Sequence, residues 1–175
     1  MSDSSRYLGR DPGSRIRDPE RAESVRDSSG IRDSKLDELV AAARAVREHA
    51  RAEFSHFKVG AALETANGTI VTGCNIENAT YGLTVCAERV AMFKAISEGH
   101  REFRRIVVVA PPEAPTPPCG ACRQILWEFA GDIEVVLANL NGETGRHRIS
   151  ELLPQPFDAR LLNRGRGAGD RGQEG

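Results

Sequence analysis

The chain has 175 residues, and its 24 lysines and arginines nearly balance its 25 aspartates and glutamates, which leaves a formal net charge of −1. This length suits one domain with a real core, and the balanced charge excludes a whole-protein field that attracts nucleic acid or an anionic membrane. The chain starts without an apolar leader, and its strongest apolar run, residues 106–110, is far too short to span a bilayer. We therefore expect a cytoplasmic protein that binds neither a membrane nor nucleic acid.

Both ends of the chain have the composition of disordered tails. Residues 1–33 and 163–175 are rich in Ser, Arg, Asp, Gly and Pro and carry only scattered apolar side chains. Such segments bury too little surface to offset the entropy of ordering. We therefore expect a folded domain over residues 34–162.

The first half of this domain predicts a helix, a hairpin and a second helix. Apolar residues recur at helical spacing over residues 35–50, and Ser34 is placed to be the N-cap. Two short strands follow, joined at Asn67-Gly68, the dipeptide that best tolerates the positive φ angles of a tight turn. The next helix is expected over residues 86–99, and its last residue is a glycine in the place of a C-cap.

The second half alternates strand and helix. The expected strand, proline-rich loop, helix and final two strands cover residues 101–110, 111–118, 122–131, 132–139 and 145–150. The first of these strands has a continuous β-branched run, which is typical of a strand covered on both faces, and Asn141-Gly142 predicts a final hairpin. The order αββαβαββ predicts an α/β fold, a three-layer α/β/α sandwich with a mixed sheet of roughly five strands.

Three cysteines predict a metal site. Cys119 and Cys122 open a predicted helix, a pattern that fits a redox pair or half of a zinc site. Cys86 favours the metal because it lies at another helix start, where the positive dipole end favours thiolates. Three thiolates and one Zn²⁺ per chain leave a fourth position for water, as in catalytic zinc sites. The alternative is a closed structural site with Cys74 as the fourth ligand, although we expect Cys74 to be a small buried residue.

Two charged residues after Cys86 complete the expected chemistry. Glu88 reaches the same site only if Cys86 occupies the first helical turn, and there it would carry protons beside a metal-activated water. Arg89 and the two helix N-termini are the groups that can offset the negative charge of three thiolates. The pattern Cys-x-Glu followed by Pro-Cys-x-x-Cys is that of zinc nucleobase deaminases.

Five motifs, FKVGAAL, GCNIENATYG, CAER, PCGACRQ and ELLP, occur in this order. Over residues 36–162 the chain resembles the small homotetrameric cytidine deaminases, which act on free nucleosides. The resemblance implies zinc-dependent hydrolysis of cytidine and deoxycytidine to uridine and deoxyuridine, with release of ammonia, as a step of pyrimidine salvage.

The resemblance also assigns substrate contacts. It implies that Phe57 stacks on the pyrimidine and that Asn75 and Glu77 bind the ribose hydroxyls. It implies further that the backbone of Ala87 helps to hold the base. Tyr81 and Phe157 would reach active sites across the subunit boundaries of a homotetramer.

The chain departs from the family pattern in two places, of which the extra-proline stretch PTPPCG before the second cysteine pair is expected to matter little. It has Glu53-Phe54-Ser55 where the family usually has Pro-Tyr-Ser, so a fixed φ angle and a phenolic hydroxyl are lost. Two other functions stay open at this point. One is a deaminase of the same fold that acts on a nucleoside antibiotic or a polynucleotide, and the other is a zinc-stabilised module that binds nucleic acid through its tails.

Overall fold

The computed structural model describes residues 33–111, 116–157 and 161, so the two predicted tails, apart from Asp33, lie outside the described residues. Within this part of the chain no helix has the length and apolar character needed to cross a membrane. The elements follow in the order α2 (Ser34–Arg47), β1 (Gly60–Thr65), β2 (Ile70–Cys74), η2 (Tyr81–Leu83), α3 (Ala87–Ser97), β3 (Phe103–Val109), α4 (Gly120–Ala130), β4 (Glu134–Asn139), β5 (Gly142–Arg148) and α5 (Ile149–Leu152). The predicted order of the longer elements is confirmed, whereas η2 and α5 are too short to leave a periodic signal.

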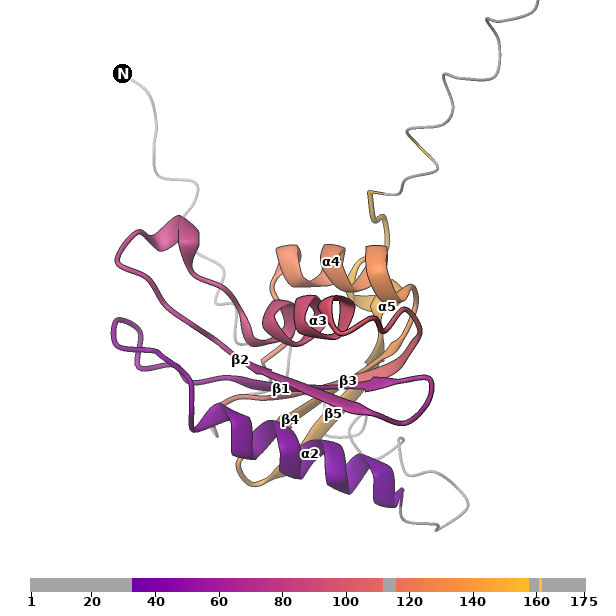
Figure 1. Ribbon diagram of the computed structural model, residues 1–175, viewed down its shortest axis with the longest axis horizontal. Helices are drawn as coiled ribbons and strands as arrows, with labels where there is room; N and C mark the ends of the chain where they lie inside the picture. The colour runs from indigo at the N-terminus through magenta and orange to yellow at the C-terminus, as the bar shows by residue number, and fades with distance from the viewer. Residues whose placement is uncertain (1–32, 112–115, 158–160, 162–175) are drawn as a thin grey trace, which may run out of the picture. The chain divides into compact units, whose positions relative to one another are not determined.

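The strands form one mixed sheet in the order β2-β1-β3-β4-β5. Strands β3 and β4 are parallel and are connected through α4, and the other neighbours are antiparallel. Figure 1 shows α2 on one face of the sheet and α3 and α4 on the other face. The predicted three-layer α/β/α sandwich with a five-stranded mixed sheet is therefore confirmed.

The central strands are buried on both faces. Alternate residues of β1, β3 and β4 point to opposite sides, which gives two apolar clusters separated by the sheet. Val107, Val109 and Val136 pack under α2, whereas Ile106 and Val108 pack under α3 and α4. This double coverage explains why the sequence of β3 has a continuous apolar run rather than an alternating one.

The predicted helix ends need three corrections. Asp33, not Ser34, caps α2, because Asp33 Oδ1 accepts a hydrogen bond from the Leu36 backbone N–H at 3.1 Å. Helix α2 ends at Arg47 rather than at residue 50, since the next three N–H groups bond to carbonyls three residues back and the helix gives way to turns. Helix α4 begins at Gly120, two residues before the predicted start.

The predicted glycine turns after β1 and after α3 form at the expected residues. Gly68 has φ +85° in the β1–β2 hairpin, and Gly99 has φ +92° after α3. The Gly99 N–H bonds to the Ile96 carbonyl at 3.1 Å, as in a helix that ends at a left-handed glycine. The last hairpin also forms, with Asn139 paired to Gly142, so its two-residue turn is Leu140-Asn141, one residue before the predicted dipeptide.

Helix α3 lies unusually close to the edge strand β2. A Cβ atom at Gly73 would lie 2.4 Å from the Ala91 nitrogen and 2.6 Å from the Ala87 oxygen, so only glycine fits at this point. This contact fixes the first turn of α3 against the sheet. That turn carries the residues that the sequence marks as functional.

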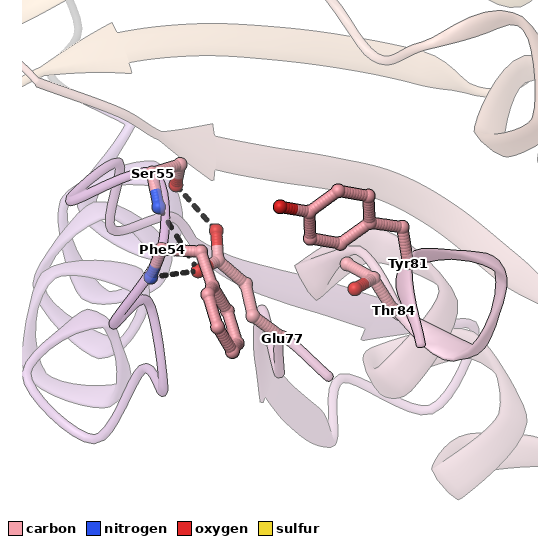
Figure 2. Close-up of a pocket in the computed structure, with 5 residues that line it drawn as sticks. All are labelled: Phe54, Ser55, Glu77, Tyr81 and Thr84. Carbon is pink, nitrogen blue, oxygen red and sulfur yellow. Dashed lines mark hydrogen bonds between the residues drawn. The ribbon is translucent and has the colours of Figure 1, made fainter. Parts of the chain in front are cut away.

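Two loops meet beyond the end of the β1–β2 hairpin. Isolated bridges join Arg51 to Ile76 and Ile76 to Val85, so the segments before β1 and after β2 lie side by side. Figure 2 shows the polar contacts between these loops, in which Glu77 faces the backbone of Phe54 and Ser55.

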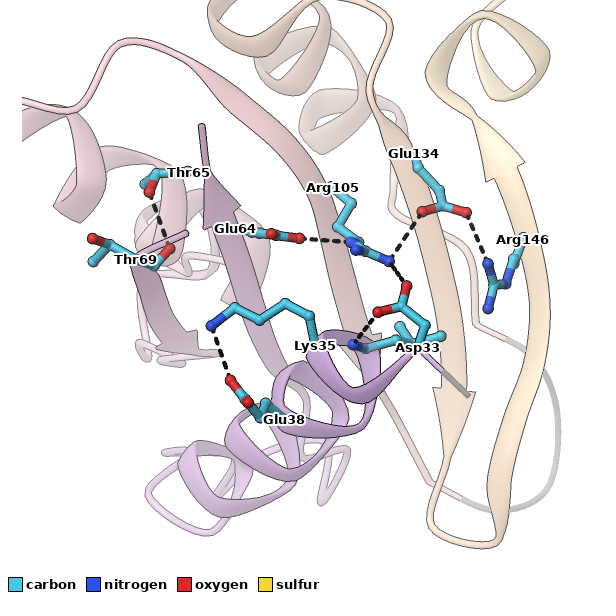
Figure 3. Close-up of polar contacts among 10 residues, drawn as sticks. Asp33, Lys35, Glu38, Glu64, Thr65, Thr69, Arg105, Glu134 and Arg146 are labelled. Carbon is cyan, nitrogen blue, oxygen red and sulfur yellow. Dashed lines mark hydrogen bonds and ion pairs between the residues drawn. The ribbon is translucent and has the colours of Figure 1, made fainter. Parts of the chain in front are cut away.

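A partly buried arginine connects α2 to the sheet (Figure 3). Arg105 Nε donates to Glu64 Oε2 at 2.6 Å, and the Glu64 side chain is only 4% exposed. Arg105 also pairs with Asp33, and Glu134 lies 3.7 Å away. The hydrogen bond from Arg105 lowers the pKa of Asp33, so the helix cap stays ionised and its contribution is lost only as the pH falls through that lowered pKa.

We expect Arg105→Met to lower the free energy of unfolding by roughly 3 kcal/mol, because Glu64 is left buried without its partner. Urea denaturation measures the change. Arg104→Met, at an exposed position near the start of the same strand, is the matched control and should change stability by less than about 0.5 kcal/mol. Equal effects of the two substitutions would show that the ion pair contributes nothing to stability.

Candidate metal centre and active site

Three thiols converge from two helix starts. Cys86 is the N-cap of α3 and Cys119 is the N-cap of α4, while Cys122 lies in the first turn of α4. Cys119 Sγ lies 3.9 Å from Cys86 Sγ and 3.5 Å from Cys122 Sγ. All three sulfur atoms lie within 4.8 Å of one another, so the structure brings together the three residues predicted to bind metal.

Arg123 holds the loop that carries Cys119. Its Nε donates to the Pro118 carbonyl at 2.7 Å, and its Nη1 donates to the Leu152 carbonyl at 2.8 Å. One guanidinium therefore ties the start of α4 to the end of α5. This contact fixes where Cys119 lies relative to the helix.

The cluster favours a thiolate at Cys86. The hydrogen bond from Cys122 lowers the Cys86 pKa to about 5, with a further contribution from Arg89. The same bond and burial raise the pKa of Cys122, so Cys86 ionises first while Cys122 keeps its proton. Arg89 Nη2 lies 3.8 Å from Cys86 Sγ and also donates to the Thr84 carbonyl at 3.0 Å. Arg89 therefore lies where the sequence predicted, next to the negative sulfur.

The donor set fits zinc. Tetrahedral zinc with bonds of about 2.3 Å to sulfur places two sulfur atoms about 3.8 Å apart, and the two measured separations bracket that value. Within the described part of the chain, the cluster of potential ligands has three members, and Cys74 is not one of them. Cys74 is half-buried at the end of β2, and burial raises its pKa. A three-thiolate site with one position for a non-protein ligand therefore fits better than a closed site.

Glu88 lies against this cluster. As the second residue of α3 after the Cys86 N-cap, it meets the condition set by the sequence, and it is only 5% exposed. Burial raises the pKa of Glu88, while a hydrogen bond with Cys122 acts in the opposite direction. The carboxyl therefore holds a proton at a pH where an exposed glutamate would be ionised, which suits a group that transfers protons.

A pocket of about 370 Å³ opens between the loop before β1 and the segment after β2. Its lining residues are Phe54, Ser55, Glu77, Tyr81 and Thr84 (Figure 2). Thr84 precedes Cys86 by two residues, and its carbonyl accepts a hydrogen bond from Arg89, so Arg89 connects a pocket residue to the cysteine cluster. The volume falls in the range of sites for small molecules.

The residues predicted to contact a substrate divide into two groups. Glu77 and Tyr81 line the pocket, and Phe57 follows the pocket residue Ser55 by two positions and leaves 40% of its surface exposed. Asn75 is buried instead: its Oδ1 accepts from the Val59 N–H and its Nδ2 donates to the Phe57 carbonyl, both at 2.8 Å. Ala87 is fully buried as the first residue of α3.

Phe157 is held by its backbone rather than by its ring. Gln124 Nε2 donates to the Phe157 carbonyl at 2.7 Å, and the Phe157 N–H donates to Gln124 Oε1 at 3.1 Å. The ring remains 57% exposed. Sequence reasoning gave Gln124 no role, because its partner is 33 residues away and no local pattern marks such a contact.

The unusual Glu53-Phe54 pair is accommodated without a proline. Glu53 forms an ion pair with Arg51, and the Phe54 ring meets Tyr81 edge to face, with ring centroids 6.1 Å apart and an interplanar angle of 77°. The Phe54 N–H donates to Glu77 Oε2 at 2.8 Å. Backbone contacts to Glu77 therefore hold the loop where the family pattern has a rigid residue.

We expect Cys86→Ser to reduce bound zinc from about one per chain to less than about one tenth, because only two thiolate ligands remain. Metal analysis of purified protein by mass spectrometry checks this. Cys74→Ser removes a cysteine outside the cluster and should leave the zinc content unchanged. Zinc loss in the Cys74 variant, or full retention in the Cys86 variant, would contradict the assignment.

Comparison with known proteins agrees with this geometry. The family model for the cytidine and deoxycytidylate deaminase zinc-binding region matches residues 33–139. A cytidine deaminase from Halalkalibacterium halodurans is 50% identical over 126 residues, which cover 71% of this chain and 96% of that protein. One from Sporosarcina psychrophila is 48% identical over 129 residues, covering 73% and 95%. The crystal structure of cytidine deaminase from Burkholderia pseudomallei is similar with a TM-score of 0.67 at 48% identity, covering 69% of this chain and 98% of that one. The chain therefore belongs to the cytidine deaminase family.

Proposed function

We propose that the protein hydrolyses cytidine and deoxycytidine to uridine and deoxyuridine with release of ammonia, as a step of pyrimidine salvage. One observation carries the proposal: three thiols suited to a zinc ion lie against the buried carboxyl of Glu88. A metal site with a position for water beside such a carboxyl is an arrangement for hydrolysis. The adjacent pocket has room for a nucleoside.

Cys86, Cys119 and Cys122 hold the zinc ion. When bound, zinc supplies a Lewis acid that lowers the pKa of a water molecule. Three thiolates oppose this effect through their negative charge. Arg89 and the N-termini of α3 and α4 offset that charge, since Arg89 lies 3.8 Å from the Cys86 sulfur.

Glu88 moves the protons. Its carboxyl donates a proton to N3 of the cytosine ring, regains one from the water that adds at C4, and passes it to the departing amino group. It then takes the remaining proton from the C4 hydroxyl as the C4 carbonyl of uridine forms, which restores the carboxyl. Each transfer requires a group whose pKa lies near the working pH. Burial moves Glu88 in this direction, because it raises the pKa of Glu88 above the ordinary value of a glutamate.

The pocket and its surroundings bind the substrate. Phe57 stacks on the pyrimidine, which the exposure of its ring supports, and the Ala87 backbone holds the base at the start of α3. Glu77 accepts a ribose hydroxyl, which its place in the pocket wall supports. Asn75 offers the sugar its second Nδ2 hydrogen, since the first is used by the Phe57 carbonyl.

The active protein is a homotetramer in this proposal. Tyr81 and Phe157 are 76% and 57% exposed, far more than is usual for aromatic side chains that function within their own subunit. The resemblance assigns both to subunit boundaries, with Phe157 reaching a neighbour's site and Tyr81, which also lines the pocket of its own chain, lying where two subunits meet. The proposed location is the cytoplasm, where thiols remain reduced and available to the metal.

Light scattering should give a mass near four times the 19.0 kDa of the chain. Phe157→Ala should reduce turnover, because the neighbouring pocket loses a wall. Mixing it with an inactive Glu88→Gln protein under conditions of subunit exchange should restore part of the activity, since some sites then combine an intact Glu88 with a neighbour's intact Phe157. A fully active monomer, or no recovery in the mixture, would contradict sites shared between subunits.

Glu88→Gln should lower ammonia release from cytidine by roughly 10³-fold while zinc stays bound, because the amide cannot transfer protons. Glu98→Gln, at the exposed end of the same helix, is the matched control and should retain full activity. Cytidine, deoxycytidine, cytosine and CMP are assayed in parallel. Full activity of Glu88→Gln would reject the mechanism, and turnover confined to cytosine or CMP would reject the nucleoside substrate.

A further inference from the structure

The Ser55 hydroxyl forms hydrogen bonds to Glu77, in the segment after β2, and to Phe57, in its own loop before β1. Ser55 Oγ donates to Glu77 Oε1 and accepts from the Phe57 N–H at 3.0 Å. Glu77 belongs to the segment after β2, whereas Phe57 belongs to the segment before β1. Figure 2 shows the bond between Ser55 and Glu77. Ser55 therefore connects a pocket carboxylate to the backbone of Phe57.

The hydrogen bonds that Glu77 accepts leave it few acceptor positions for a ligand. A carboxylate has about four acceptor positions. Glu77 Oε2 accepts from the N–H groups of Phe54 and Ser55, at 2.8 and 3.2 Å, and Oε1 accepts from the Ser55 hydroxyl. About one position remains, on Oε1. These bonds, that of Ser55 first, lower the pKa of Glu77, so the group is an ionised acceptor suited to a single hydroxyl donor.

Phe57 is fixed at both of its backbone groups. Its N–H donates to Ser55 Oγ, and its carbonyl accepts from Asn75 Nδ2 at 2.8 Å. The residue before it, His56, has φ +57°, a left-handed conformation that costs energy in a residue with a side chain. The His56 N–H bonds to the Ala52 carbonyl at 2.9 Å. The chain thus reverses at a strained residue, and Ser55 stabilises that reversal on the side of Phe57.

We propose that Ser55 is a positioning residue that fixes Glu77 and Phe57 relative to each other, so that one sugar hydroxyl and the base are bound together. The inference rests on the proposed function and names a residue that determines how the nucleoside is held. Ser55 itself does not touch the reacting atoms. Its loss therefore weakens the binding of substrate and leaves the proton transfers at Glu88 in place.

The test compares Ser55→Ala with Ser55→Thr, which keeps a hydroxyl at the same carbon. Ser55→Ala should raise KM for cytidine about tenfold, as expected when a hydrogen bond to a charged group is lost, with kcat within about threefold of the wild type. Ser55→Thr should restore KM to within about threefold. Zinc content and Tm are measured for each variant, and Ser97→Ala, which removes an exposed hydroxyl that bonds only within its own helix, is the control.

Two further readouts separate positioning from a general loss of structure. With 2′,3′-dideoxycytidine, which offers Glu77 no secondary hydroxyl, the KM penalty of Ser55→Ala should shrink. In a double-mutant cycle, Ser55→Ala combined with Glu77→Ala should cost less than the sum of the two single substitutions, because both remove the Ser55–Glu77 contact.

The inference is overturned by an unchanged KM in Ser55→Ala, by a Ser55→Thr variant as impaired as Ser55→Ala, or by an equal penalty with the dideoxy substrate. These results differ from a failure of the proposed function. If the wild type deaminates cytidine and Glu88→Gln does not, an indifferent Ser55→Ala rejects this inference alone. If the wild type releases no ammonia from cytidine, both fall together.

Discussion

The site depends on bringing the positive ends of two helices to one point. Three sulfur atoms lie within 4.8 Å of one another at the starts of α3 and α4, where unpaired N–H groups and positive dipole ends favour the thiolates that a metal ion requires. Gly73 permits this arrangement for α3, since a side chain would collide with the backbone of Ala87 and Ala91. Arg123 holds the loop before Cys119 for α4. The position of the three cysteines therefore depends on the close backbone packing at Gly73 and on the bond from Arg123 to the Pro118 carbonyl.

The two parts of the site are built by different forces. The metal ligands lie on helices packed against the sheet, so apolar burial holds them. The pocket is made by two exposed loops, and side-chain hydrogen bonds to the backbone hold it instead. A substrate must enter and leave through the second part, which an apolar core would close. Arg89 joins the two parts, because one nitrogen contacts both the Thr84 carbonyl and the Cys86 sulfur.

The sequence predicts what is encoded locally. Long periodic segments, glycine turns and thiols at helix starts all leave patterns within a few residues, and the sandwich and the cysteine cluster follow from them. Asp33 caps α2 through Oδ1, and its other oxygen accepts from Arg105, which lies 72 residues away. The roles of Ser55 and Gln124 likewise depend on partners 22 and 33 residues away. Such contacts exist only after the sheet has brought distant loops together, so no local pattern records them.

The Glu53-Phe54 variant shows which contacts tolerate a change of side chain. Glu77 is held by the N–H groups of Phe54 and Ser55, which every residue except proline supplies, so replacing tyrosine by phenylalanine leaves both bonds intact. The bond to Glu77 Oε1 depends instead on the side chain of Ser55, because the two N–H groups of this loop bond to Oε2. The phenol that is lost at position 54 leaves an apolar edge against Tyr81. The polarity of that wall of the pocket then comes from the hydroxyl of Tyr81, which Figure 2 shows turned toward Ser55 and Glu77.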